Sequence, residues 1–228
     1  MTRPRLLDLF CCQGGAGTGY DRAGFEVVGI DIEPQPLYPF GFIQADALDV
    51  LDHWDLSAFA AIHASPPCQH FTTMSNRHRG TGSRADDHLD LLTPTLALLR
   101  CLPVPWVVEN VPPAKRVMQA TLTLHGGMFG LGVHRPRIFE SNVLILAPTA
   151  RPVANPLGVY GKHHDGRRLF DRADGTIQRA PKTLAEARQA MGMPWADWIG
   201  CKEAIPPAYT EFIGTQLLEH LAAVRGAA

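Results

Sequence analysis

The stretch RLLDLFCCQGGAGTGYDRAGFEVVGID, residues 5–31, decides the fold class. It begins with a short apolar run at 5–10, continues into a glycine-rich turn, and then has a composition compatible with a helix. A second apolar run at 25–30 follows and ends in Asp31. This order of elements is typical of a β-α-β unit, in which two parallel strands are connected by a helix.

Three further short apolar runs continue the alternation, and each ends in polar residues. The run near 41–45 ends in Asp46, the run at 59–64 ends in SPPCQ, and the run at 106–108 ends in Glu109-Asn110. The clearest helical pattern, with leucines spaced by three and four, lies at 88–101. We therefore predict an α/β fold with a Rossmann-like, doubly wound, mostly parallel sheet. Ligands bind to such sheets beyond the carboxyl ends of the strands, where these polar residues are expected.

Composition excludes several classes of protein. The chain has 228 residues, a formal net charge of -1 and 46% hydrophobic residues, which is ordinary for a soluble globular protein. A near-zero charge excludes a generally basic nucleic-acid coat, so any nucleic-acid contact needs a local patch. The five cysteines contain no C-x-x-C pair, which favours reduced thiols over a disulfide framework or a zinc site. No apolar run approaches the ~18 residues that span a bilayer, so we expect a cytoplasmic protein.

The chain changes character after residue 140. Residues 141–182 hold seven Lys or Arg against three Asp and show little apolar periodicity. We interpret 140–182 as a small basic region between a domain at 1–139 and C-terminal helices at 183–228 that return to that domain. The capping box T-L-A-E predicts a helix from Thr183 to Met191, and a last helix is predicted over 208–224.

The glycine-rich turn is the first candidate site. Gly14 and Gly15 place backbone amides and a helix N-terminus beside a ligand. Asp31 ends the next strand, where an acidic residue accepts hydrogen bonds from ribose hydroxyls. Together they favour a nucleotide-like cofactor over a plain tight turn. A full dinucleotide is less favoured, because Q-G-G-A-G-T-G does not fit G-x-G-x-x-G.

Three further segments hold candidate catalytic residues. Two prolines fix a rigid turn before Cys68; a lone cysteine is more often an inert buried thiol, but the strand-end position and polar neighbours favour a nucleophile. Glu109 ends a central hydrophobic strand, where burial should raise its pKa and suit it to donate or share a proton. Arg135 and Arg137 lie two apart, on one face if the segment is a strand; they are either surface charges or a grip for a carbonyl or phosphate.

These segments, in this order, resemble the cytosine-C5 methyltransferases that use S-adenosylmethionine, along nearly the whole chain. DLFCCQGGAGTGYDRAGF is similar to the family's first motif, SPPCQHFT to the catalytic-cysteine motif, ENV to the glutamate motif and HRPRIF to the motif of paired arginines. The resemblance implies a class I methyltransferase fold and S-adenosyl-L-methionine as the cofactor. The sequence differs where Cys12 replaces a usual glycine, Val133 a usual glutamine, and AIPPAYTEFIG the usual Gly-Asn-Ser motif.

The resemblance also implies residue roles. Cys68 would be the nucleophile, Glu109 the partner of cytosine nitrogen 3, and Arg137, with Arg135, a holder of the ring oxygen or a support of the site. The implied cofactor-binding residues are Phe10, Gly14, Gly15, Asp31, Ile32, Asp46, Ala47 and Pro66. The expected substrate-binding residues are Pro67, Gln69, Asn110, Arg77, Arg79, Lys162, Arg167 and Arg168.

Two basic segments are the candidates for nucleic-acid contact. Residues 72–85 carry Arg77, Arg79 and Arg84 without an acid, which indicates either a basic loop that closes over a nucleic-acid backbone or a solvated surface loop. The short recognition region between Phe139 and Thr183 carries basic residues that favour phosphate contacts over base readout. His163 and His164 lack two further spaced ligands, so we expect no metal.

Three interpretations of function follow. The leading one is a DNA cytosine methyltransferase of the restriction-modification kind, monomeric and without a membrane partner, that forms a Cys68 adduct with a flipped-out base. The second applies the same chemistry to RNA or to a free cytosine nucleotide, and rests on the short recognition region. The third is a non-catalytic protein that binds cofactor and nucleic acid, against which the intact cysteine, glutamate and arginines argue.

Overall fold

The computed structural model describes residues 2–69, 71, 89–151, 153, 155–161, 165–171 and 177–227. Six residues considered above for nucleic-acid or metal contact lie outside the described residues: Arg77, Arg79, Arg84, Lys162, His163 and His164.

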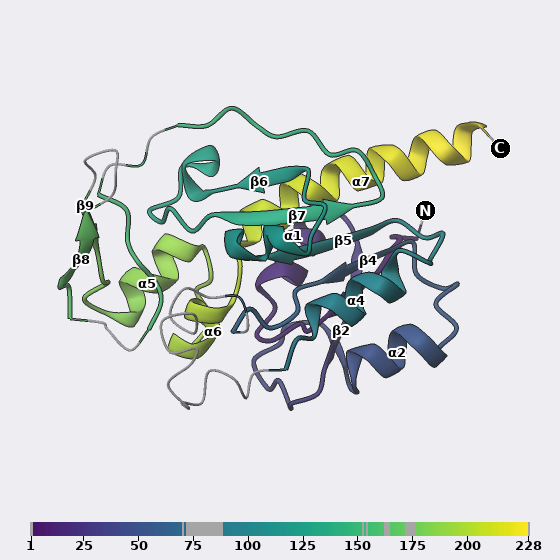
Figure 1. Ribbon diagram of the computed structural model, residues 1–228, viewed down its shortest axis with the longest axis horizontal. Helices are drawn as coiled ribbons and strands as arrows, with labels where there is room; N and C mark the ends of the chain where they lie inside the picture. Colours follow the sequence, from purple (N-terminus) through teal and green to yellow (C-terminus); the bar gives the residue numbers. More distant parts are fainter. Residues whose placement is uncertain are drawn as a thin grey trace.

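A seven-stranded sheet forms the centre of the described chain (Figure 1). Its strand order is β3-β2-β1-β4-β5-β7-β6. Five strands run parallel: β1 (Arg5–Leu9), β2 (Glu26–Asp31), β3 (Gly41–Gln44), β4 (Ala61–Ala64) and β5 (Trp106–Asn110). β7 (Arg137–Ser141) lies antiparallel between β5 and β6 (Leu122–Leu124). The predicted α/β class with a doubly wound, mostly parallel sheet is confirmed.

Helices cover both faces of this sheet. α1 (Gly15–Ala23) and α7 (Pro207–Ala227) pack on one face, and α2 (Ala47–His53) and α4 (Leu92–Leu99) pack on the other (Figure 1). The parallel strands are apolar on both faces, because alternate residues such as Leu6 and Leu7 enter the two different cores. Two short 3₁₀ helices, η1 (Pro112–Arg116) and η2 (Gly126–Phe129), connect β5, β6 and β7.

The order of the strands places a ligand-binding crevice between β1 and β4. From β1 the chain adds β2 and β3 on one side, and it then adds β4 and β5 on the other. The loops after β1 and β4 therefore flank the point where the winding reverses, which is where α/β sheets of this kind bind ligands. The Ser65 N–H donates a hydrogen bond to the Leu9 carbonyl at 3.2 Å, which ties the two loops together.

One predicted helix begins later than its leucine pattern indicates. We predicted a helix over 88–101, but α4 begins at Leu92, and Leu89 lies outside it with 75% of its surface exposed. The Asp90 carboxylate accepts hydrogen bonds from the N–H groups of Leu92 and Thr93, both at 3.1 Å. That side chain satisfies the first free N–H groups of the helix and so fixes where it begins.

The C-terminal part adds a small third core. β8 (Arg168–Asp171) and β9 (Ile177–Arg179) pair with each other, and α5 (Leu184–Met191) and α6 (Trp198–Glu203) follow. The Thr183 hydroxyl accepts from the Glu186 N–H at 3.1 Å, which confirms the predicted cap. Leu157 and Val159 pack against α5, so the basic region shares its core with the C-terminal helices. β7 runs across the predicted boundary at 139.

Candidate active site

A cavity of about 510 Å³ lies at the carboxyl ends of β1, β2, β4 and β5. Its volume is within the range of small-molecule and cofactor sites. Seven of the eight predicted cofactor residues line it: Phe10, Gly15, Asp31, Ile32, Asp46, Ala47 and Pro66. Five predicted catalytic or substrate residues line the same cavity: Pro67, Cys68, Gln69, Glu109 and Arg137. Segments distant in the sequence therefore meet at one site, as expected from the parallel strand ends.

The turn after β1 forms one wall of the cavity. Phe10 and Cys12 have φ angles of 58° and 46°, in the left-handed region, and Gly14 has a φ of 79°. Cys12 thus adopts a conformation that glycine favours, and its N–H donates to Asp31 Oδ2 at 2.9 Å. Gly14 does not line the cavity; a side chain at this position would lie 2.8 Å from Pro39 Cδ. Gly14 therefore shapes the turn.

Residues that follow β2 and β3 extend this wall of the cavity. Ile32 lines the cavity and has 62% of its surface exposed, although it is a large apolar side chain. Asp46 is the N-cap residue of α2, and its Oδ1 accepts a hydrogen bond from the Leu48 N–H at 2.8 Å. An open apolar surface beside a carboxylate suits a flat ring that carries a hydrogen-bond donor.

Cys68 lies in the opposite wall, in the turn after β4. Burial raises the pKa of the Cys68 thiol, and the positive charge of Arg137 opposes this rise. The turn is held by Asn110, whose side-chain N–H donates to the Pro66 carbonyl at 2.9 Å. Asn110, which we predicted to contact substrate, does not line the cavity. Its observed contact indicates that it positions the cysteine turn.

Glu109 lies beside this turn, at the end of β5. Its Oε1 accepts from Arg137 Nε at 2.7 Å, and both side chains are largely buried. Burial raises the pKa of the Glu109 carboxyl, while Arg137 and a hydrogen bond from Ser65 oppose the rise. The predicted direction of this shift is confirmed. The carboxyl is therefore suited to hold a proton more readily than an exposed acid does.

Arg135 and Arg137 have different surroundings. We expected them on one face only if the segment were a strand, and that condition is not met at Arg135, because β7 begins at Arg137 and Arg135 has a φ of 35°. Pro136 lacks the N–H that a strand ladder needs, which explains the late beginning. The buried Arg135 guanidinium donates to three carbonyl oxygens, of Ala204 (2.8 Å), Val159 (2.8 Å) and Lys202 (2.6 Å). Of the two roles considered for Arg135, this geometry favours support of the site.

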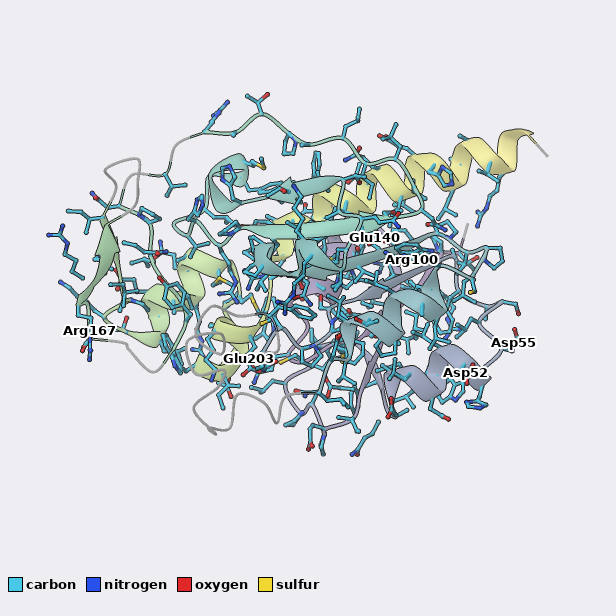
Figure 2. All side chains as sticks on the ribbon, in the orientation of Figure 1. Asp52, Asp55, Arg100, Glu140, Arg167 and Glu203 are labelled. Atoms are coloured by element: carbon cyan, nitrogen blue, oxygen red, sulfur yellow. The ribbon has the colours of Figure 1, made fainter. Side chains whose placement is uncertain are left out.

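Of the basic residues predicted to contact nucleic acid, the two that the structure describes do not line the cavity. These two, Arg167 and Arg168, are exposed at the beginning of β8. The Arg167 guanidinium forms an ion pair with Asp165 at 2.7 Å. Figure 2 shows Arg167 at the end of the molecule opposite Asp52 and Asp55.

The described residues contain neither a cluster of metal-binding side chains nor a membrane-spanning helix. None of them forms a group of three His, Cys, Asp or Glu side chains that could hold a metal ion. No helix within the described ranges is long and apolar enough to cross a membrane.

Sequence analysis missed several residues of the site. Lys202 and Glu203 line the cavity from α6, and no motif in the sequence indicates this. Ser65 lines it within the motif noted for its cysteine, and His63 lies behind Ser65 in β4. A polar residue inside an apolar run was the available signal for His63.

Comparisons with known proteins identify related structures only. No protein-family model matches the chain, and no curated protein matches it in sequence. A protein described as a DNA modification methyltransferase, encoded within an E. coli prophage, matches with a TM-score of 0.60 at 14% identity, over 96% of this chain and 99% of that one. The Dnmt2 methyltransferase of S. pombe matches with a TM-score of 0.55 at 14% identity, over 96% and 99%. The Entamoeba histolytica methyltransferase EhMeth matches with a TM-score of 0.54 at 14% identity, over 97% and 98%.

These matches concern the fold. At 14% identity they show that the chain has the Rossmann-like fold of class I methyltransferases over nearly its whole length. The names of these neighbours refer to methyl transfer. The chemistry of this chain has to be inferred from its own site residues.

Proposed function

We propose that this protein transfers a methyl group from S-adenosylmethionine to carbon 5 of cytosine in DNA. The reaction proceeds through a covalent adduct between Cys68 and carbon 6 of a flipped-out base. The observation that carries the proposal is the convergence of Cys68, Glu109 and Arg137 on a cavity that the predicted cofactor residues also line. A protein that only binds cofactor and nucleic acid has no need of a buried thiol beside a carboxyl of raised pKa.

The described residues fit the proposed cofactor. The Asp31 carboxylate accepts from the Cys12 and Glu33 N–H groups, and its oxygens have further lone pairs for the ribose hydroxyls. The exposed apolar surface of Ile32 suits adenine, and the Asp46 carboxylate suits its amino group. When bound, S-adenosylmethionine supplies an electrophilic methyl group on a sulfonium centre. Its positive charge is compatible with the acidic Asp31, Glu33 and Asp46 in the lining.

Cys68 makes the weakly nucleophilic cytosine ring reactive. The thiol first loses its proton to solvent, the thiolate then adds to carbon 6, and this addition makes carbon 5 nucleophilic. Arg137 lowers the cost of thiolate formation, because its positive charge opposes the effect of burial on the pKa of Cys68. After carbon 5 has been methylated, loss of its proton and expulsion of the Cys68 thiolate restore the aromatic ring.

Glu109 and Arg137 stabilise the charge that develops during the addition. Electrons from the broken double bond move toward nitrogen 3, where a protonated Glu109 donates a hydrogen bond or a proton. Arg137 contacts Glu109 through Nε and holds the ring oxygen with the rest of its guanidinium. Arg135 contributes by holding the segments around the site through its three backbone contacts.

The nucleic acid must deliver an unstacked base. Carbon 6 of a stacked cytosine is inaccessible to a thiol inside a cavity, so a duplex substrate has to flip the base out, at a cost of a few kcal/mol. The basic residues at 165–182 and within 72–85 supply charge for the phosphates. Because phosphate contacts are not specific to DNA, RNA and free nucleotides belong among the acceptors tested.

The test is transfer of labelled methyl from S-adenosylmethionine. Duplex DNA, single-stranded DNA, tRNA and deoxycytidine monophosphate are offered in parallel to the wild type and to Cys68→Ala. We expect label as 5-methylcytosine in duplex DNA, at least about 10³-fold reduced in the variant, since loss of a covalent nucleophile removes the reaction route.

Other outcomes separate the alternatives. Label in tRNA or the monophosphate alone would retain the chemistry and refute DNA as the substrate. Label that persists in Cys68→Ala would refute the covalent route. Absence of transfer to every acceptor, with intact cofactor binding, would support the non-catalytic alternative.

A further inference from the structure

A row of polar side chains crosses the sheet face that α1 and α7 cover. Asp8 of β1 and His63 of β4 are register partners, and Glu109 of β5 follows two residues after Val107, the other partner of His63. All three polar side chains are buried. Buried polar groups in central strands are costly unless they are hydrogen bonded, so their partners indicate what they do.

His63 connects α1 to the active site through hydrogen bonds. The Tyr20 hydroxyl of α1 lies 3.0 Å from His63 Nδ1, and His63 Nε2 lies 2.8 Å from Ser65 Oγ. Ser65 lines the cavity together with Glu109, and as a hydrogen-bond partner it lowers the pKa of the Glu109 carboxyl. Two consecutive hydrogen bonds thus run from a buried tyrosine to Ser65, which lies at the cavity beside the Glu109 carboxyl. The mechanism above assigns no role to Tyr20, His63 or Ser65.

The donor and the acceptor can be assigned for each hydrogen bond in this series. Burial lowers the pKa of His63 to about 3, so the imidazole is neutral and carries hydrogen on one nitrogen only. Within the described residues the Tyr20 hydroxyl has Nδ1 as its partner, and a buried hydroxyl keeps its hydrogen in a bond. Tyr20 therefore donates to Nδ1, His63 donates from Nε2 to Ser65, and the Ser65 hydrogen is left for the Glu109 carboxylate.

We propose that Tyr20, His63 and Ser65 are positioning residues, which direct a hydrogen bond at Glu109 and hold its carboxyl group in the orientation in which it meets the substrate. The inference deepens the proposed function and rests on it. Arg137 alone contacts one carboxylate oxygen and leaves the group able to rotate about that contact. The hydrogen bond from Ser65 restrains this rotation of the carboxyl group. The hydrogen bond from His63 in turn orients the Ser65 hydroxyl toward Glu109.

The charged groups around the relay, defined as Tyr20, His63 and Ser65, act in known directions. Arg137 and Arg135 favour the ionised form of Glu109, and burial opposes it. Asp8 and Glu109 both raise the pKa of Tyr20, in addition to its burial, so the phenol keeps its hydrogen. Tyr20 therefore remains a hydrogen-bond donor to His63, at the end of the relay opposite Glu109.

The test uses two variants that remove relay hydrogen bonds. Ser65→Ala removes the last bond, and Tyr20→Phe removes the first while the buried ring remains. Thr95→Val is the matched control, because it removes a buried hydroxyl that donates to the Leu91 carbonyl at 2.7 Å within α4, under the other face of the sheet. The carboxyl carbon of Glu109 is followed by NMR during a pH titration of the ligand-free protein, and kcat and KM are measured for each variant.

We expect Ser65→Ala to raise the pKa of Glu109 by about 1, as for the loss of one hydrogen bond to an ion, and to lower kcat about 10-fold because the carboxyl group loses its fixed orientation. Tyr20→Phe should shift both in the same directions by less, because His63 can then also take its hydrogen on Nδ1 and accept the Ser65 hydrogen. KM for S-adenosylmethionine should not change in either variant. Thr95→Val should change neither the Glu109 titration nor kcat.

Two results would overturn the relay. One is an identical Glu109 titration in the wild type, Ser65→Ala and Tyr20→Phe. The other is a fall in kcat that matches only the loss of folded protein, as a purely structural role requires. If the wild type methylates no cytosine acceptor, the proposed function fails; the titration needs no substrate and still decides whether the relay acts on Glu109.

Discussion

The sheet domain and the basic region around β8 and β9 are held together in different ways. In the sheet domain, apolar cores on both faces fix parallel strands whose ends bring Cys68 and Glu109 into one cavity. In the basic region, a two-stranded ribbon carries exposed arginines. Leu157 and Val159, which precede this ribbon in the sequence, share a small core with α5 and α6.

Under the proposed function, this difference separates catalysis from recognition. A rigid scaffold can hold reacting groups within the narrow tolerance that catalysis needs, whereas exposed side chains on a ribbon can adapt to a phosphate backbone. Substitutions in the sheet domain should therefore change kcat or stability strongly. Substitutions in the basic region should change binding weakly and in a salt-dependent way.

Among substitutions that keep the Cys68 nucleophile, the largest effect is expected from Glu109→Gln. The amide keeps the shape of the side chain but cannot donate a proton to the ring, so we expect kcat to fall about 10²–10⁴-fold with the fold intact. Glu140→Gln is the matched control, since Glu140 is also a buried glutamate, paired with Arg100 at 2.8 Å and outside the cavity (Figure 2). Steady-state methyl transfer measures both. Equal losses of kcat in the two variants would show that the effect is not specific to the site.

The second expected effect concerns stability and distinguishes the two neighbouring arginines. Arg135→Met removes the donor of three carbonyl oxygens, two in buried and one in a partly buried contact, and should lower the free energy of unfolding by about 3 kcal/mol or more. Arg137→Met should lower kcat and destabilise the fold less, because the released Glu109 can take up a proton. Urea unfolding and methyl-transfer assays on both variants measure this. A larger loss of stability in Arg137→Met would reverse the assignment.

These two arginines also show where prediction from sequence ends. The strand order and the meeting of Cys68 with Glu109 were predictable, because strands buried on both faces appear as apolar runs and parallel strands end at one edge. The role of Arg135 was not predictable, because it depends on a φ of 35° and on carbonyls 24 to 69 positions away in the sequence. His63 was hidden for a similar reason, since nothing local in its apolar run indicates Tyr20 as a partner.

The third effect is a pH dependence of stability that arises in the sheet domain. Burial raises the pKa of Asp8 from 3.8 to about 8, and its Oδ1 has no hydrogen-bond partner within the described chain. The native state therefore keeps a proton that the unfolded state releases. The stabilisation from this proton is complete below pH 3.8 and is lost as the pH rises through about 8.

Asp8→Asn tests this directly, because it replaces the carboxyl with a neutral group of similar size. The wild type should lose a few kcal/mol of unfolding free energy between pH 5 and pH 9, and the variant should lose less. Urea titrations at the two pH values give the comparison. Parallel pH curves for the two proteins would mean that Asp8 is ionised in the native state.

The smallest effect is expected in the basic region, from Arg167→Gln. If Arg167 contacts one phosphate, the slope of log K against log salt should become shallower by at most about 1. The ion pair with Asp165 at 2.7 Å competes with that contact, so Asp165→Asn should strengthen duplex binding. Arg22→Gln is the control, because Arg22 is also exposed and pairs with Glu211 at 3.8 Å on the α1 and α7 side. Binding titrations of duplex DNA at several KCl concentrations measure all three variants. Opposite changes in affinity at positions 165 and 167, with no change at 22, would place phosphate on this ribbon, whereas equal slopes in all variants would remove it from the interface.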